Sequence, residues 1–127
     1  MENKKVYAMK FSKIYPLLIQ KAERKNRSKD EVDEIIYWLT GYDKKGLENQ
    51  LENDVDYETF FGNAPHINPD MALIKGKICG ISIESIEEPL MRKIRCLDKM
   101  IDELAKGKSM DKIFEKFFGR VVEGNRG

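Results

Sequence analysis

Apolar residues recur every three or four positions along most of the chain, and this spacing predicts α-helices with one buried face. Two faces in the first third are clear: Ile14, Leu17, Leu18 and Ala22, then Val32, Ile35, Ile36 and Leu39. Ser12 is the expected N-cap of the first helix, and Pro16 lies in its early turns, where proline is tolerated. The residues from Val6 to Phe11 are expected to form a short extended arm.

Capping residues mark the next boundaries. Ser28 and Glu31 have the spacing of a capping box, in which each side chain bonds the other's free backbone N–H. Gly41 is placed to end that helix in the left-handed conformation. Asp43 and Asp56 are the expected caps of two further short helices. These helices carry the apolar residues Leu47, Leu51, Phe60 and Phe61.

The segment from residue 63 to residue 81 has two interpretations. The favoured one is a loop, NAPHINPD, followed by a helix that is capped by Asn68, starts at Pro69 and ends at Gly80. Its shared face would be Met71, Ile74 and Ile78. The competing interpretation is a strand through ICGISI, because apolar residues alternate there. Gly80 at the centre of that stretch weakens a strand.

The last third of the chain is expected to be helical from Ser82 to about Lys106, with a kink at Pro89. Ser109 would cap a final helix that carries Met110, Ile113, Phe114 and Phe117. Together these elements predict an all-α fold: a compact bundle of about six helices, with one long helix in the C-terminal half, forming a single domain over residues 1–127. The ends, about residues 1–5 and 119–127, are expected to be frayed.

Two parts of the pattern match at a regular offset and suggest two related helix–turn–helix units. Residues 35–47, around Gly41, align with residues 74–86, around Gly80, and residues 51–61 align with residues 104–114. The offset grows by about two heptads, which returns the apolar face to nearly the same direction. An internal duplication is one explanation, and a chance likeness of short helices is the other.

Composition removes several classes of function. The 127 residues include 23 basic and 22 acidic side chains, a formal charge of +1, so no overall field draws the chain to nucleic acid or to a membrane. No apolar stretch approaches the roughly 18 residues of a membrane-spanning helix. Two cysteines, Cys79 and Cys96, are too few for a disulfide scaffold. The expected location is the reducing cytoplasm.

The long helix carries a coiled-coil pattern. Its apolar residues are spaced four and three apart, which makes a continuous seam: Leu90, Ile94, Leu97, Ile101 and Leu104. Such a seam must be covered, either by the chain's own helices, which is the favoured interpretation, or by a second copy. The seam is therefore the candidate interaction face for a homo-oligomer or a protein partner.

Polar candidates for chemistry are few. Asp98 and Asp102 lie one turn apart with Arg95 beside them, and two such carboxylates could bind a metal or share a proton. A solvated flank with an Arg95–Asp98 ion pair is the favoured interpretation. His66 and Asn68 are candidates for a small-ligand site, although stabilising their loop is the favoured role. We predict no catalytic residue, no metal site and no cofactor.

The corner at Trp38–Leu51 is similar to the turn of a DNA-reading helix pair, because a glycine separates two helices. Two features disfavour that interpretation: Tyr37 is bulky where the helices should approach, and the second helix is more acidic than basic. Phosphate contacts supply most non-specific affinity, so such a helix is a poor DNA reader. Nucleic-acid binding remains the alternative function, aided by the basic arm of Lys4, Lys5, Lys10 and Lys13.

Three segments, WLTGY, FFGNAPHINP and EEPLMRKIRCLDKMIDELAKGKSMDKI, resemble a small bacterial family known as domain-of-unknown-function family 2200. The likeness runs from about Val6 to Phe114. It implies a stand-alone, cytosolic, helical protein with no catalytic residues to carry over. The expected function is a non-enzymatic module that self-associates or binds a partner protein. An enzyme that uses the Asp98–Asp102 flank or the His66 loop is less favoured.

Overall fold

The structure is a computed structural model that describes residues 2–74, 76–78 and 80–114. The α-helices in that part of the chain are α1 (Glu2–Tyr7), α2 (Phe11–Glu23), α3 (Lys29–Thr40), α4 (Lys44–Glu52), α5 (Tyr57–Gly62) and α6 (Pro89–Ala105). A two-stranded sheet, β1 (Lys77–Ile78) and β2 (Ile81–Ser82), lies between two 3₁₀ turns, η1 (Pro69–Leu73) and η2 (Ile83–Ser85). Residues 110–114 are also helical. The all-α fold is thus confirmed.

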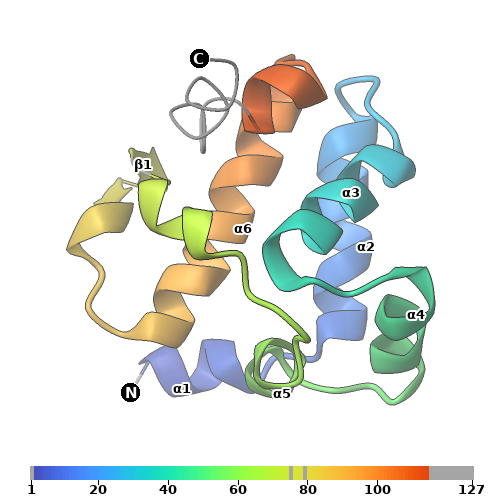
Figure 1. The fold of residues 1–127 in the computed structure, drawn as a ribbon, viewed down its shortest axis with the longest axis vertical. Coiled ribbons are helices and arrows are strands. Elements are labelled where there is room, and N and C mark those ends of the chain that lie inside the picture. The colour runs from blue at the N-terminus through green and yellow to red at the C-terminus, as the bar shows by residue number, and fades with distance from the viewer. Residues whose placement is uncertain (1, 75, 79, 115–127) are drawn as a thin grey trace.

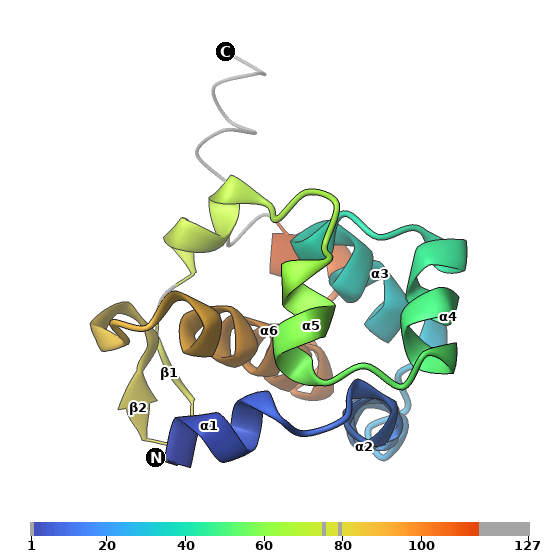
Figure 2. The ribbon, with the colours of Figure 1, turned by 90° about the horizontal axis from the view of Figure 1, so that it is seen from below.

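Helix α6 is the spine of the molecule (Figure 1). Seen from below, α6 lies between α1 and α2 on one side and α3 on the other, and α5 crosses in front of its end (Figure 2). Helices α2, α3 and α5, strand β1 and the η2 turn all pack against it. The buried apolar side chains of these elements form one continuous cluster, so the described part of the chain has a single core.

The helix caps of the central region form as their sequence predicts. Ser28 and Glu31 make both halves of the capping box at the start of α3. Gly41 ends α3 with a φ of 80°, in the left-handed region. Asp43 accepts a hydrogen bond from the Gly46 amide at the start of α4, and Asp56 caps α5 in the same way. Local sequence therefore sets these boundaries.

The extended arm predicted for Val6 to Phe11 is wrong. Val6 belongs to helix α1, and Phe11 is the first residue of α2. The link between the two helices is fixed by the segment before α5, because the Phe11 amide donates to the Val55 carbonyl at 2.8 Å. Ser12 does not cap α2; its hydroxyl group donates to the carboxylate of Asp54 instead.

The helix predicted to start at Pro69 and end at Gly80 is also wrong. Asn68 does cap an element there, but it is the five-residue 3₁₀ turn η1. An antiparallel hairpin follows, in which Ile78 pairs with Ile81. Gly80 lies in the turn with a φ of 79°, a conformation that glycine adopts without strain. The competing strand interpretation was closer, although the chain reverses at Gly80 rather than continuing through it.

The long helix starts later than predicted. No helix continues from Ser82 through Pro89; α6 begins at Pro89 itself. Proline suits this first position because its missing N–H would have no partner there. After α6 ends, Gly107 takes a φ of 100°. The Ser109 hydroxyl then accepts from the Lys112 amide at 3.2 Å, which is the predicted cap of the last helix.

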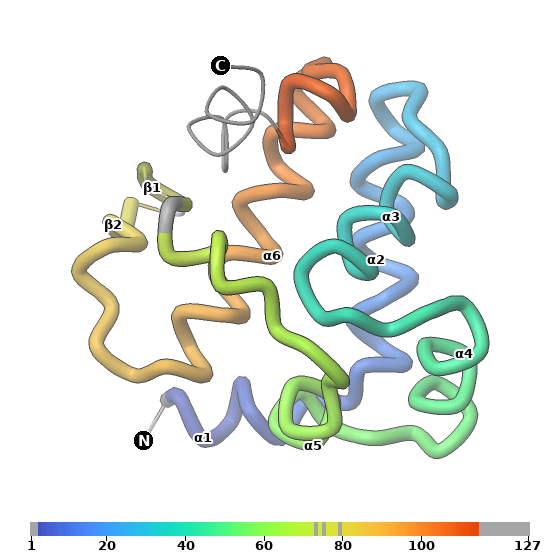
Figure 3. The backbone as a smooth tube through the Cα atoms, in the orientation of Figure 1, coloured from blue at the N-terminus to red at the C-terminus, as the bar shows by residue number. Residues whose placement is uncertain are grey.

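The two predicted repeat units differ in structure. Residues 35–47 form helix, corner and helix, whereas residues 74–86 contain the β1–β2 hairpin and the η2 turn. The hairpin and α4 lie on opposite sides of the molecule (Figure 3). The prediction of two related helix–turn–helix units is therefore wrong, because apolar spacing around a glycine does not distinguish a helical corner from a hairpin.

In the described part of the chain, no helix combines the length and the apolar character needed to cross a membrane. The predicted frayed end, residues 119–127, and Phe117 lie outside the described residues.

Candidate functional site

The predicted seam on α6 is covered by the chain itself. Four of its five residues, Ile94, Leu97, Ile101 and Leu104, are at most 1% exposed. Leu90, at the start of the helix, is partly buried. The covering elements are the helices, strand and turn that pack on α6. The favoured interpretation of internal cover is confirmed, and the seam as a whole is not a free interaction face in this structure.

His66 and Asn68 hold their loop against the end of α3. The His66 amide donates to the Thr40 carbonyl, and the Asn68 amide donates to the Leu39 carbonyl, each at 3.0 Å. The Asn68 side chain accepts from the Asp70 amide at 2.9 Å. The side chain of His66 is exposed. These contacts support the role of stabilising the loop.

Asp98 and Asp102 have separate partners. Asp98 pairs with Arg95 at 3.2 Å, whereas Asp102 pairs with Lys21 at 3.3 Å and with Lys106 at 3.2 Å. Burial alone would raise the pKa of Asp102, but the ammonium groups of Lys106 and Lys21 together lower it. No group of three or more potential metal ligands occurs among the described residues. The two carboxylates therefore serve as ion-pair partners.

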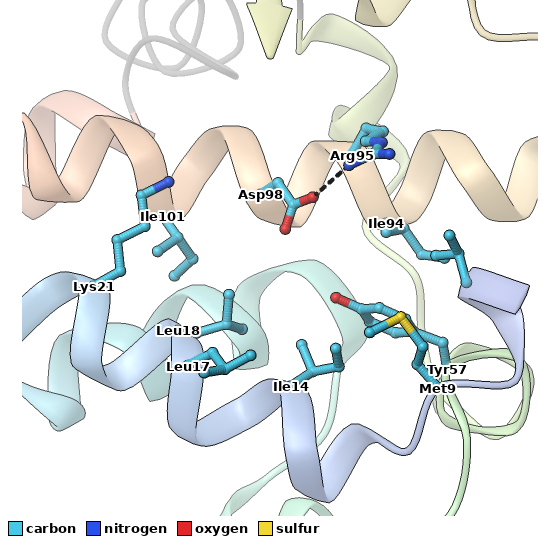
Figure 4. A pocket seen from close by; sticks show the side chains of 11 residues that line it. Met9, Ile14, Leu17, Leu18, Lys21, Tyr57, Ile94, Arg95, Asp98 and Ile101 are labelled. Atoms are coloured by element: carbon cyan, nitrogen blue, oxygen red, sulfur yellow. Dashed lines mark hydrogen bonds and ion pairs between the residues drawn. The ribbon is translucent and has the colours of Figure 1, made fainter. Parts of the chain in front are cut away.

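Two of these flank residues, Arg95 and Asp98, line a pocket between α2 and α6 (Figure 4). We call it the α2–α6 pocket, and its volume is about 310 Å³. It is lined by Val6, Met9, Ile14, Leu17, Leu18, Lys21, Tyr57, Ile94, Arg95, Asp98 and Ile101. Pockets of roughly this size with mainly apolar walls and a few polar groups are typical of ligand sites.

Polar groups gather on one wall of this pocket. The Tyr57 hydroxyl group and the Asp98 carboxylate both point into the space between α2 and α6 (Figure 4). Burial is the largest influence on Asp98 and raises the pKa of its carboxyl group, although Arg95 acts in the opposite direction. Burial also raises the pKa of Tyr57, and the charge of Asp98 raises it further. The tyrosine is therefore a neutral hydrogen-bonding group at physiological pH.

Two exposed apolar side chains stand at the mouth of the pocket. Leu17 is 56% exposed and Met9 is 44% exposed, and both belong to the pocket lining. Among the described residues, Ile81 is the one other large apolar side chain with comparable exposure. The sequence pattern placed Leu17 on the buried face of its helix, which is wrong. Exposed apolar surface that clusters beside a pocket is typical of an interaction site.

A second polar cluster, which the sequence pattern did not predict, links α2 to α3. The hydroxyl group of buried Tyr15 donates to the Asp33 carboxylate, and Lys29 pairs with the other carboxylate oxygen at 2.8 Å. Burial, followed by this bond, raises the pKa of Tyr15 to about 12. Every polar group of the cluster has a partner, so we assign it a structural role. The four-residue spacing of Lys29 and Asp33 was the available signal.

The corner at Trp38–Leu51 consists of α3, Gly41 and α4. Tyr42 at the corner is buried, and its hydroxyl group donates to the Phe60 carbonyl at 2.6 Å. The exposed surface of α4 carries Glu48 and Glu52 beside its two lysines. No feature of this corner favours a DNA-reading role over a packed junction.

Cys96 is a buried free thiol in the core. Burial raises its pKa to about 11, which keeps the thiol protonated and unreactive. Cys79 lies outside the described residues.

Comparison with known proteins identifies the family of this chain. The model of a bacterial family, described as an uncharacterized protein conserved in bacteria (DUF2200), matches residues 5–115. The chain belongs to this family. The resemblance found in the sequence is thus confirmed.

A solved structure has a closely similar fold. The chain is similar to the crystal structure of the uncharacterized protein SP1917, with 46% sequence identity and a TM-score of 0.85. The likeness covers 90% of this chain and 93% of that one. No curated protein matches the chain.

Proposed function

We propose that this DUF2200 protein is a non-enzymatic module that self-associates through the face formed by α2, α6 and the end of α1. The observation that carries the proposal is the exposure of Leu17 and Met9, both of which line the α2–α6 pocket. Burying exposed apolar surface against a partner is the main source of association free energy. A second copy of the chain is the partner to which we commit.

Charge on this face supports a second copy as the occupant. Lys13 and Lys21 lie one turn before and one turn after Leu17, so the edge formed by α2 is basic. Asp98 and Asp102 place carboxylates along the edge formed by α6, where they also pair with Arg95, Lys21 and Lys106 of the same chain. Helices α2 and α6 run side by side in the same direction at the pocket (Figure 4). A two-fold axis along the pocket therefore brings the lysines on the α2 edge of each copy over the carboxylates on the α6 edge of the other.

This arrangement suits the symmetry of ordinary dimers. A two-fold interface uses the same patch on both copies, so the patch must complement itself. The Leu17 side chain of each copy would cover the mouth of the other copy's pocket, and the charged edges would form the rim. The cytoplasm is the compartment we propose for this dimer, in keeping with the free thiol of Cys96.

The test is the substitution Leu17→Glu, measured by sedimentation velocity over a range of protein concentrations. The parent chain is expected to shift from monomer to dimer as its concentration rises. Leu17→Glu is expected to remain monomeric at every concentration, because it places a charge in the centre of an apolar contact. Leu17 is exposed, so the variant should fold as the parent does.

The matched control is Ile81→Glu, which changes an exposed apolar side chain on β2, outside the pocket lining. It should dimerise like the parent. A parent chain that stays monomeric at all concentrations contradicts the proposal. So does a Leu17→Glu variant that dimerises as well as Ile81→Glu.

A further inference from the structure

The α2–α6 pocket has a polar wall whose hydrogen-bonding capacity is not used within the described chain. One Asp98 oxygen, Oδ2, accepts from Arg95 at 3.2 Å, whereas no hydrogen bond to a described residue involves the other oxygen, Oδ1. The Tyr57 hydroxyl group likewise has no hydrogen bond to a described residue, although the residue is only 3% exposed. Buried tyrosine hydroxyl groups are normally satisfied, whereas the Asp98 side chain is 25% exposed and open to the pocket.

The two groups make complementary demands on a ligand. The free Asp98 oxygen is an acceptor and requires a donor, whereas the Tyr57 hydroxyl group can donate to an acceptor. A single hydroxyl group on a ligand is both donor and acceptor, so it can satisfy both. The opposite wall is formed by apolar side chains of α2, Ile14 and Leu18, which suit a hydrocarbon body.

Charge around the pocket selects against an ionic ligand. Arg95 already neutralises Asp98, and Lys21 is paired with Asp102. Among its described residues, the wall therefore offers no unpaired charge to offset the hydration that an ammonium group or a carboxylate would lose on entering the pocket. A neutral polar group avoids this penalty.

We propose that the α2–α6 pocket binds a small neutral amphiphile, a hydrocarbon chain or ring that carries one hydroxyl group. The hydroxyl group donates to Asp98 Oδ1 and accepts from Tyr57 Oη, and the hydrocarbon lies against Ile14 and Leu18. This site is formed within one chain, so it does not require the dimer proposed above. In the dimer, the second copy would close the mouth of the pocket over the ligand.

The experiment is a titration of the isotope-labelled chain with three probes of equal length, 1-hexanol, hexylammonium and hexanoate, followed by NMR shifts of the pocket residues. We expect saturable shifts with 1-hexanol and at least about tenfold weaker binding of each ion, because an ion must give up its hydration without meeting an unpaired counter-charge. Tyr57→Phe is expected to weaken 1-hexanol binding by about fivefold, the usual effect of one lost hydrogen bond.

The control is Tyr42→Phe, which removes a buried hydroxyl group that does not line the pocket. It should bind 1-hexanol as the parent does. The proposal is overturned if 1-hexanol gives no saturable shift, if either ion binds as tightly, or if Tyr57→Phe binds as tightly as Tyr42→Phe. Tyr57→Phe should leave the sedimentation behaviour unchanged, so failure of the ligand site and failure of the dimer are separate results.

Discussion

Gly41 shows how one residue positions a whole loop. Its φ of 80° turns the chain out of α3, and the His66 backbone then packs directly on its α-carbon. A Cβ atom at this position would lie 2.8 Å from both the nitrogen and the oxygen of His66. That backbone is held by the bond from the His66 amide to Thr40. The position therefore requires glycine for two separate reasons, conformation and space.

Gly41→Ala is expected to destabilise the fold. Holding a residue with a side chain in the left-handed region costs about 1–3 kcal/mol, and the contact with His66 adds to that cost. Urea unfolding measures the change in the free energy of unfolding. Gly62→Ala is the control, because a Cβ atom there meets nothing within 4 Å. A Gly41→Ala variant as stable as Gly62→Ala would contradict this account.

Residue-scale signals explain why part of the molecule could be predicted from its sequence. The capping box of Ser28 and Glu31 and the turn at Gly41 depend on neighbours within a few residues, so the pattern is sufficient. The placement of Tyr57 and Asp98 on the same wall of the pocket depends on how α5 packs on α6. No local pattern contains that information. The sequence therefore predicted Arg95 and Asp98 as candidates but did not predict Tyr57.

At the scale of elements, Arg27 fastens the start of α3 to the end of α6. Its guanidinium group donates to the Leu104 carbonyl at 3.0 Å and to the Lys108 carbonyl at 2.6 Å. Glu31 holds the same guanidinium group from the other side, with Arg27 Nη2 at 2.7 Å. One side chain thereby joins the start of α3 to the end of α6 and to the residues that follow it.

The ion pair between Arg27 and Glu31 makes the stability of the fold depend on pH. The bond from Arg27, followed by the Ser28 amide, lowers the pKa of Glu31 from 4.5 to about 2. A carboxyl group with a lowered folded-state pKa stabilises the fold above its unfolded pKa and loses that contribution as the pH falls toward the folded value. Glu31→Gln is therefore expected to be less stable than the parent at neutral pH, and the difference should shrink between about pH 4.5 and pH 2.

Thermal unfolding at a series of pH values measures this difference. Glu34→Gln, a substitution of an exposed carboxylate on the same helix, is the control and should differ little from the parent across the range. A difference between Glu31→Gln and the parent that stays constant down to pH 2 would show that the ion pair between Arg27 and Glu31 contributes no charge-dependent stability.

Elements were predicted well from α2 to α5, and poorly at α1, before Pro89 and around Gly80. Ile78 and Ile81 satisfy both a helical spacing and a hairpin pairing. The hairpin forms because it packs on α6, where Lys99 donates to the Lys77 carbonyl at 3.2 Å and pairs with Glu103 at 3.3 Å. Tertiary contacts of this kind override weak local preferences.

At the scale of the whole molecule, the packing on α6 decides which apolar surface remains outside. The apolar seam of α6 is buried in the core, whereas Leu17 and Met9 stay exposed beside the pocket. Helical spacing placed Leu17 with Ile14 and Leu18, but only the latter two face α6 and the core. The sequence identifies an apolar face, and the arrangement of neighbouring helices decides which of its edges is left uncovered.

The dimer through the Leu17 face is the central claim, and dilution of a chain with ¹³C-labelled methionine methyl groups tests it most directly. The methyl resonance of Met9, at the mouth of the pocket, should shift as the protein is diluted from dimer to monomer. The resonance of Met100, which is 0% exposed in the core, should not move. A Met9 resonance that stays fixed over the same range of concentrations would contradict the account.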